Sequence, residues 1–95
     1  MMGLDTNVLV RYIMQDDAKQ AAKATKLIES LSPDAPGFVT LVSVIELVWV
    51  LSSCFDLTRE QITQALNALL RAKQLVVDQA DQVVRALRTY SSSSA

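Results

Sequence analysis

Hydrophobic residues follow two kinds of pattern along this chain. Short apolar runs at 1–5, 37–41 and 74–78 are typical of buried strands. Outside these runs, apolar positions recur with the spacing of one helix face. This spacing predicts helices over 6–14, 16–31, 43–55, 58–70 and 78–90. Because strands separated by helices pair in parallel, we expect an α/β layer fold with a short parallel sheet flanked by helices.

Polar residues at the starts of the helical segments predict where the helices begin. Thr6 and Ser43 are expected to cap the first and third helices, and the acidic pair at 16–17 the second. Thr58, followed three residues later by Gln61, has the spacing of a capping box. The third helix is apolar around nearly its whole circumference, so we expect it in a core or an oligomer interface.

The composition limits the classes of protein to which the chain can belong. The 95 residues are 51% hydrophobic, which is enough to bury a core or a large partner surface and excludes disorder for most of the chain. The net charge of −1 provides no positive field that would attract nucleic acid from a distance, so any such contact must be local. Polar residues interrupt the longest apolar stretch, 38–55, and we therefore expect no membrane segment and a cytoplasmic protein.

The absence of histidine excludes several kinds of chemistry. A chain without histidine has no Ser-His or Cys-His nucleophile pair, no imidazole general base and no His-ligated zinc. The single cysteine, Cys54, lies in an apolar run and is expected to be a buried structural thiol. If the chain catalyses a reaction, carboxylates are the groups that remain for it, with a metal ion as a possible partner.

Two acidic residues differ from the others, which occupy helix starts, turns and solvated faces. Asp5 directly follows the first apolar run, at the carboxyl end of a predicted parallel strand, where open α/β sheets place their ligand sites. Glu46 lies in the apolar third helix with no Lys or Arg three or four residues away. A buried carboxylate in that position would need a partner or a cation, because burying it unpaired costs several kcal/mol.

Both residues also have a purely structural interpretation. Asp5 can be a simple cap of the first helix, with Thr6 and Asn7 as turn residues, and Glu46 can close a capping box with Ser43. The joint pattern favours a site, because two consecutive strand-to-helix junctions each present one carboxylate at the same edge of a parallel sheet. Two converging carboxylates are suited to Mg²⁺ or Mn²⁺.

The residues around these acids resemble a known family. The segments are GLDTNVLVRYI, GFVTLVSVIELVWVLSSCFDLTREQI and QLVVD, and they resemble the amino-terminal two-thirds of a PIN domain of the VapC toxin type. The resemblance covers 3–90 and implies a three-layer PIN-like fold. It further implies that Asp5 and Glu46 are catalytic and metal-binding residues and that Thr6, Asn7 and Ser43 support them.

The resemblance also implies an activity and partners. PIN domains of this type are Mg²⁺- or Mn²⁺-dependent endoribonucleases that hydrolyse RNA with a metal-activated water. They are usually inhibited by a cognate antitoxin protein and are usually homodimers. We therefore expect RNA as the substrate, an antitoxin as a partner and a homodimer as the assembly.

The chain departs from the family pattern at its C-terminal end. A third acidic ligand, and often a fourth, is expected after a segment like RTYSSSSA, whereas Asp78 and Asp81 come too early to replace them. We therefore expect a truncated PIN-like domain over 1–90, incomplete at its C-terminal end, and a disordered Ser-rich tail over 91–95. Two alternatives to a ribonuclease stay open: a catalytically inactive PIN-like fragment acting as an interaction or self-association module, and a small helical adaptor in which both carboxylates are only caps.

Overall fold

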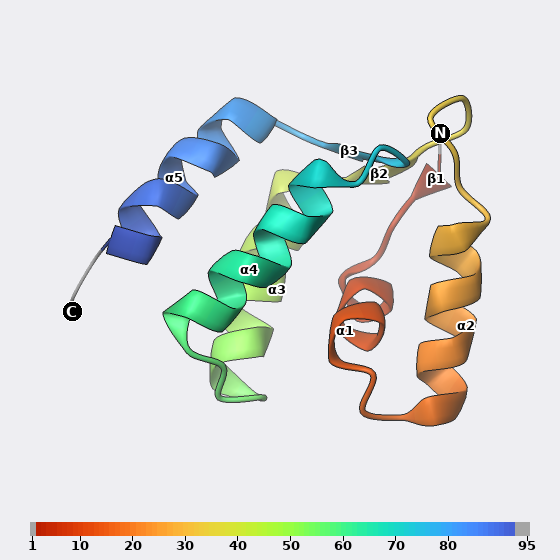
Figure 1. Cartoon of the computed structure of the whole chain (residues 1–95), viewed down its shortest axis with the longest axis horizontal. Coiled ribbons are helices and arrows are strands. Elements are labelled where there is room, and N and C mark those ends of the chain that lie inside the picture. The colour runs from red at the N-terminus through yellow and green to blue at the C-terminus, as the bar shows by residue number, and fades with distance from the viewer. Residues whose placement is uncertain (1, 93–95) are drawn as a thin grey trace.

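Strands and helices alternate along the chain as the hydrophobic pattern predicts. The structure is a computed structural model and describes residues 2–92. Within this range the elements are, in order, β1 (Met2–Gly3), α1 (Thr6–Met14), α2 (Ala18–Glu29), β2 (Gly37–Val39), α3 (Leu41–Ser53), α4 (Arg59–Arg71), β3 (Leu75–Val77) and α5 (Ala80–Ser92) (Figure 1). The protein has the predicted α/β PIN-like fold.

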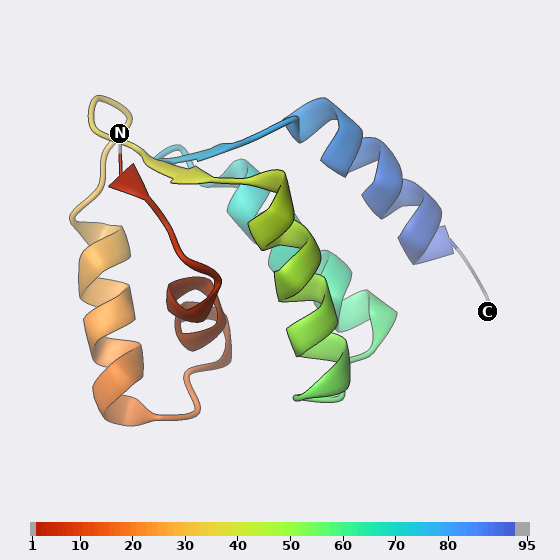
Figure 2. The same cartoon turned by 180° about the vertical axis from the view of Figure 1, so that it is seen from behind.

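The three strands form one parallel sheet in the order β1-β2-β3. Phe38 in the central strand lies opposite Gly3 on one side and Val76 on the other. In Figure 1 the sheet lies in the upper part of the view and α1, α2, α3 and α4 lie below it. Helix α4 is in front of α3 in this view and behind it in the opposite view of Figure 2. Along this row α2 packs against α1, α1 against α3, α3 against α4, and α4 against α5.

The core lies between α1, β2, α3 and α4. Its fully buried side chains are supplied by all four elements and include Leu9, Val39, Leu47, Leu51 and Ile62. No polar or charged side chain among the described residues is buried. The fold is therefore held together by apolar contacts between the helices and the sheet.

Gly37 allows the sheet to pack closely against its neighbours. A Cβ atom at this position would lie 2.7 Å from Leu31 Cδ1 and 2.9 Å from Leu4 Cδ1, closer than real carbon contacts. A Cβ atom at Gly3, the other glycine of the sheet, would have no neighbour within 4 Å. Only the glycine of β2 is therefore required by its surroundings.

Two of the predicted helix starts are wrong, and two are confirmed. The N-cap of α1 is Asp5 rather than Thr6. The N-cap of α3 is Thr40, so this helix begins before Ser43. Asp17 caps α2, and Thr58 caps α4 with the predicted capping box.

The ends of α3 and α5 also differ from the sequence prediction. Cys54 follows the last residue of α3 and is exposed, so the prediction of a buried thiol is wrong. The physical reason is that the chain leaves the core at this C-cap. Helix α5 continues to Ser92, into the segment expected to be a tail, and 93–95 lie outside the described residues. Over 2–92 the structure contains no helix with the length and hydropathy of a membrane span.

Candidate functional site

Asp5 stands at the junction between β1 and α1. Its backbone is extended, and its Oδ1 atom accepts a hydrogen bond from the backbone N–H of Asn7 at 2.6 Å. This bond satisfies one of the amide groups that the start of a helix leaves without a partner. The carboxylate itself is exposed. The structural interpretation of Asp5 as a helix cap is thus confirmed, but a capping carboxylate keeps a second oxygen for a ligand.

Glu46 lies in the second turn of α3, on the side that faces the start of α1. The hydroxyl of Thr6 lies 3.5 Å from Glu46 Oε1, within reach of a long hydrogen bond. Thr6 is the first residue of α1 and follows Asp5 directly. This contact therefore places the carboxylates of Asp5 and Glu46 at the same edge of the sheet, as the parallel topology predicts.

The environment of Glu46 differs from the expected one. We expected the side chain to be buried and to need a partner for that reason, but Glu46 is exposed. Helix α3 buries Val44, Leu47 and Leu51, whereas Glu46 lies on a face that the core does not cover. The desolvation argument for a cation at Glu46 is therefore wrong, and any metal role rests on the convergence of the two acids.

The alternative in which Glu46 closes a capping box with Ser43 is also wrong. The backbone N–H of Ser43 donates to Thr40 Oγ1 at 3.1 Å, and the Thr40 hydroxyl lies 3.1 Å from Ser43 Oγ. Ser43 is thus inside the helix and cannot be its cap. Its contact with Thr40 braces the first turn of α3, the helix that carries Glu46.

Thr40 is the residue at this edge that the sequence prediction missed. The sequence places it inside the predicted strand 37–41, because it lies within the short run GFVTL. No local signal separates it from Ser43, because both residues carry a hydroxyl that can cap the apolar helix that follows. Thr40 directly follows β2 and caps α3, and Asp5 lies two residues after the end of β1 and caps α1.

The arrangement is limited in the metal ions it can hold. Over the described residues no three side chains of the types Asp, Glu, Cys and His form a group that could bind a metal. Asp78 follows β3 and extends the sheet through its backbone N–H, which donates to Val39 O at 2.8 Å, but it joins no such group. Two carboxylates fit a Mg²⁺ ion that keeps most of its water, because this ion commonly binds through one or two carboxylates.

The topology and the site define a class of protein. The chain is an open parallel α/β protein with Asp5 after β1 and Glu46 in the helix that follows the adjacent strand β2. It belongs to the PIN domain family, whose model matches residues 2–94. PIN domains are generally nucleases that act on RNA or other nucleic acids and typically use divalent metal ions. No curated protein and no solved structure is significantly similar to the chain.

Proposed function

We propose that this protein is a Mg²⁺- or Mn²⁺-dependent endoribonuclease of the VapC toxin type, in which Asp5 and Glu46 are the catalytic and metal-binding residues. The observation that supports the proposal is the contact between Thr6 and Glu46. Through it, two carboxylates from different strand-to-helix junctions share one edge of a PIN-domain sheet.

In this proposal, neighbouring residues hold and orient the two carboxylates. The Asn7 backbone N–H holds Oδ1 of Asp5, which leaves Oδ2 to bind the ion. The Thr6 hydroxyl orients Glu46, and the contact between Ser43 and Thr40 braces the helix that carries it. When bound, the divalent ion would supply Lewis-acid chemistry for phosphodiester hydrolysis.

Electrostatics explains why such a site requires a cation. In the described part of the chain the two carboxylates accept hydrogen bonds only from a backbone N–H and a hydroxyl, and no Lys or Arg forms an ion pair with either. Their negative charges would repel an RNA phosphate. Because two carboxylates hold a hydrated ion loosely, we expect full activity to require further acidic ligands.

The remaining features of the proposal follow from the resemblance to VapC toxins. They are a cytoplasmic location, inhibition by a cognate antitoxin protein and a homodimeric assembly. A second candidate function is a catalytically inactive PIN-like module that binds another protein or itself. The exposed apolar side chains of α3, Val42, Ile45 and Trp49, favour this alternative.

Calorimetric titration with Mn²⁺ tests the proposed site. We expect the parent protein to bind Mn²⁺ and both Asp5→Asn and Glu46→Gln to lose binding while remaining folded. Asparagine is as good an N-cap as aspartate, so Asp5→Asn removes the charge and keeps the cap. Asp17→Asn, the same substitution at the N-cap of α2, is the matched control and should bind as the parent does.

The result also separates the two candidate functions. Unchanged Mn²⁺ binding in both site variants, or no binding by the parent, would contradict the metal site and leave the interaction module. Cleavage of a single-stranded RNA by the parent in Mn²⁺, absent in both site variants and present in the control, would support the nuclease.

A further inference from the structure

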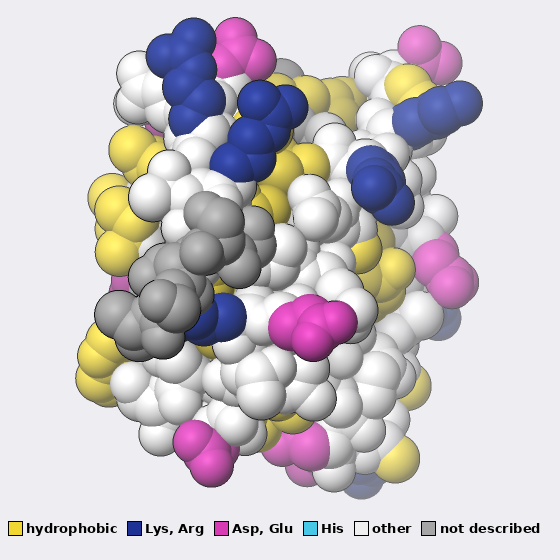
Figure 3. Space-filling view, turned by 60° about the vertical axis from the view of Figure 1, so that its left-hand side comes forward, with side chains coloured by type: hydrophobic (Ala, Val, Ile, Leu, Met, Phe, Trp, Pro, Cys, Tyr) yellow, Lys and Arg dark blue, Asp and Glu magenta, His cyan; other side chains and the backbone are white. Residues whose placement is uncertain are grey.

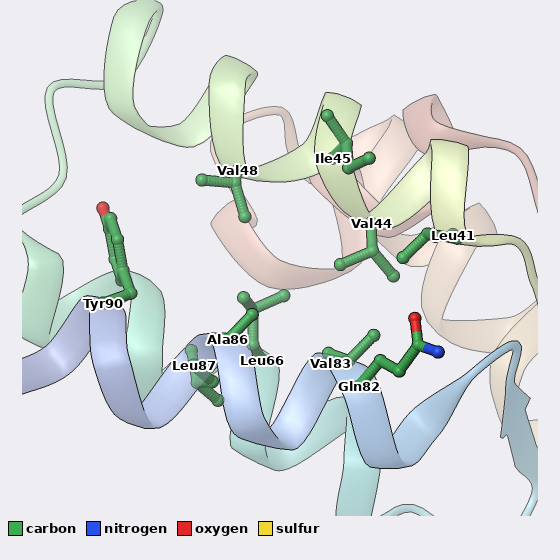
Figure 4. A pocket seen from close by; sticks show the side chains of 10 residues that line it. All are labelled: Leu41, Val44, Ile45, Val48, Leu66, Gln82, Val83, Ala86, Leu87 and Tyr90. Atoms are coloured by element: carbon green, nitrogen blue, oxygen red, sulfur yellow. The ribbon is translucent and has the colours of Figure 1, made fainter.

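Trp49 is the only tryptophan of the chain, and its side chain lies on the surface of α3. It is 63% exposed, although tryptophan is highly buried on average. An apolar groove lies between α3 and α5, and Figure 4 shows Val44 and Val48 extending into it from α3. Trp49 does not line this groove. The packing of the described residues therefore leaves its ring uncovered.

Trp49 is a neighbour of Glu46 on the surface of α3. Residues three apart on a helix have Cβ atoms about 5–6 Å from each other. Because the side chains of a helix lean toward its N-terminus, the ring of Trp49 is directed toward the turn that contains Glu46. Glu46 in turn contacts Thr6 at the start of α1. The start of α1, the carboxylate of Glu46 and the exposed ring therefore follow one another across the surface.

Two aliphatic side chains extend the apolar face of α3 beside Trp49. Val42 and Ile45 are 66% and 61% exposed, and they lie about two turns and one turn before Trp49 on the same face. In Figure 3 hydrophobic side chains gather along the left-hand edge, the side on which α3 lies. The ring of Trp49 thus ends a short apolar stripe that has Glu46 along one side.

The charges around the candidate site limit how it can hold RNA. Helix α3 has no Lys or Arg, and Glu46 is its only charged residue. The net charge of the chain is −1, and the carboxylates of the site repel phosphates. Contacts between phosphates and cationic side chains, which supply most non-specific binding of nucleic acids, are therefore not provided by this helix. Contacts to the bases are left to hold a strand on this face.

An exposed aromatic ring is suited to binding a base. Unpaired bases of RNA are commonly recognised by stacking on aromatic side chains, tryptophan included. Stacking needs no positive charge and accepts any base, because every base has a π face. Within the described residues the indole N–H of Trp49 donates to no acceptor, so it is free to bind a ribose or phosphate oxygen.

We propose that Trp49 is the stacking platform for an unpaired base of a single-stranded RNA substrate, next to the phosphate engaged by the ion at Asp5 and Glu46. The inference rests on the proposed nuclease function and narrows its substrate to RNA with an unpaired nucleotide at the cleavage point. A lasting protein partner on this face of α3 would cover Glu46 as well, whereas a substrate strand has to come to it. The position beside Glu46 therefore favours RNA as the occupant.

Tryptophan fluorescence tests the stacking directly. Because the chain has one tryptophan, its emission reports the ring of Trp49 alone. We expect a short single-stranded RNA, added in Mg²⁺ and read before cleavage proceeds, to quench this emission. An abasic oligomer with the same number of phosphates and an RNA duplex of the same length should each quench it at least about threefold less. The first has no bases, and the bases of the second are paired.

Two substitutions separate stacking from other apolar contacts. Trp49→Leu keeps an apolar side chain without a π face, and Trp49→Phe keeps an aromatic ring. We expect Trp49→Leu to raise the dissociation constant for labelled single-stranded RNA about tenfold, measured by fluorescence anisotropy, and Trp49→Phe to raise it no more than about threefold. In RNA cleavage the same change should appear in KM and leave kcat within about twofold. Both variants should bind Mn²⁺ as the parent does.

The outcomes distinguish the base contact from the metal site. Emission that single-stranded RNA leaves unchanged, or equal RNA affinity of Trp49→Leu and the parent, would overturn the inference. A parent dimer that Trp49→Leu dissociates would place Trp49 in a protein interface and would also overturn it. Quenching by RNA in a protein that binds no Mn²⁺ would support the base contact and contradict the metal site. Mn²⁺-dependent cleavage without quenching would support the nuclease and contradict the base contact.

Discussion

The hydroxyl of Thr6 lies 3.5 Å from Oε1 of Glu46, although the two residues are forty positions apart in the chain. The contact exists because β1 and β2 are parallel neighbours, so that α1 and α3 start at the same edge of the sheet. It links the residue after Asp5 to the second acid of the candidate site.

Removing the Thr6 hydroxyl should weaken metal binding without unfolding the protein. Thr6→Val keeps the shape of the side chain and removes the donor to Glu46 Oε1. Because the bond is long, we expect the Mn²⁺ dissociation constant to rise by no more than about tenfold, at the low end for residues that orient a ligand. Thr6→Ser retains the hydroxyl and should bind as the parent does, as measured by calorimetry. Equal losses in the two variants would contradict an orienting role.

The capping role of Asp5 should be separable from its charge. Asp5→Ala removes the acceptor for the Asn7 backbone N–H and should lower the free energy of unfolding by about 1 kcal/mol. Asp5→Asn should lower it by much less, because asparagine caps equally well. Urea unfolding followed by circular dichroism measures both values. If the two variants were equally destabilised, the cap would not be the cause.

The start of α3 can be located by a pair of alanine substitutions. Thr40→Ala removes the side-chain oxygen that accepts from the Ser43 backbone N–H and should cost about 1 kcal/mol of stability. Ser43→Ala replaces a residue inside the helix by a better helix former and should change stability by less than about 0.5 kcal/mol. Thermal unfolding compares the two. The reverse order would restore Ser43 as the cap.

The two glycines of the sheet should respond differently to alanine. Gly37→Ala brings a Cβ atom into Leu4 and Leu31 and should cost about 1–3 kcal/mol, the range for overpacking. Gly3→Ala meets open space and should be close to neutral. Urea unfolding of both variants is the measurement, and a neutral Gly37→Ala would show that the two leucines move aside without cost.

Metal binding should stabilise the folded protein through the site. An ion that binds only the folded state at one hundred times its dissociation constant adds about 2.7 kcal/mol to the free energy of unfolding. We expect this stabilisation by Mn²⁺ in the parent and its loss in a chain that carries both Asp5→Asn and Glu46→Gln. Stabilisation that persists in the double variant would place the ion elsewhere.

The sequence by itself determined the order of elements, the parallel sheet and the two candidate acids. Apolar periodicity identifies strands and helices because burial requires one side of each element to be apolar. Because the chain has no histidine, carboxylates are the groups that remain for catalysis. Asp5 differs from the other acidic residues by its position after the first strand, and Glu46 by its position in an apolar helix.

Only the tertiary structure decided how those residues are used. Capping at Asp5 and Thr40, the exposure of Glu46 and Cys54, and the contact between Thr6 and Glu46 depend on where the chain meets the core. Local sequence cannot choose between Thr40 and Ser43 as a cap, because both have the right hydroxyl. The packing of α3 makes that choice by burying Val44, Leu47 and Leu51, which leaves Glu46 at the surface beside α1.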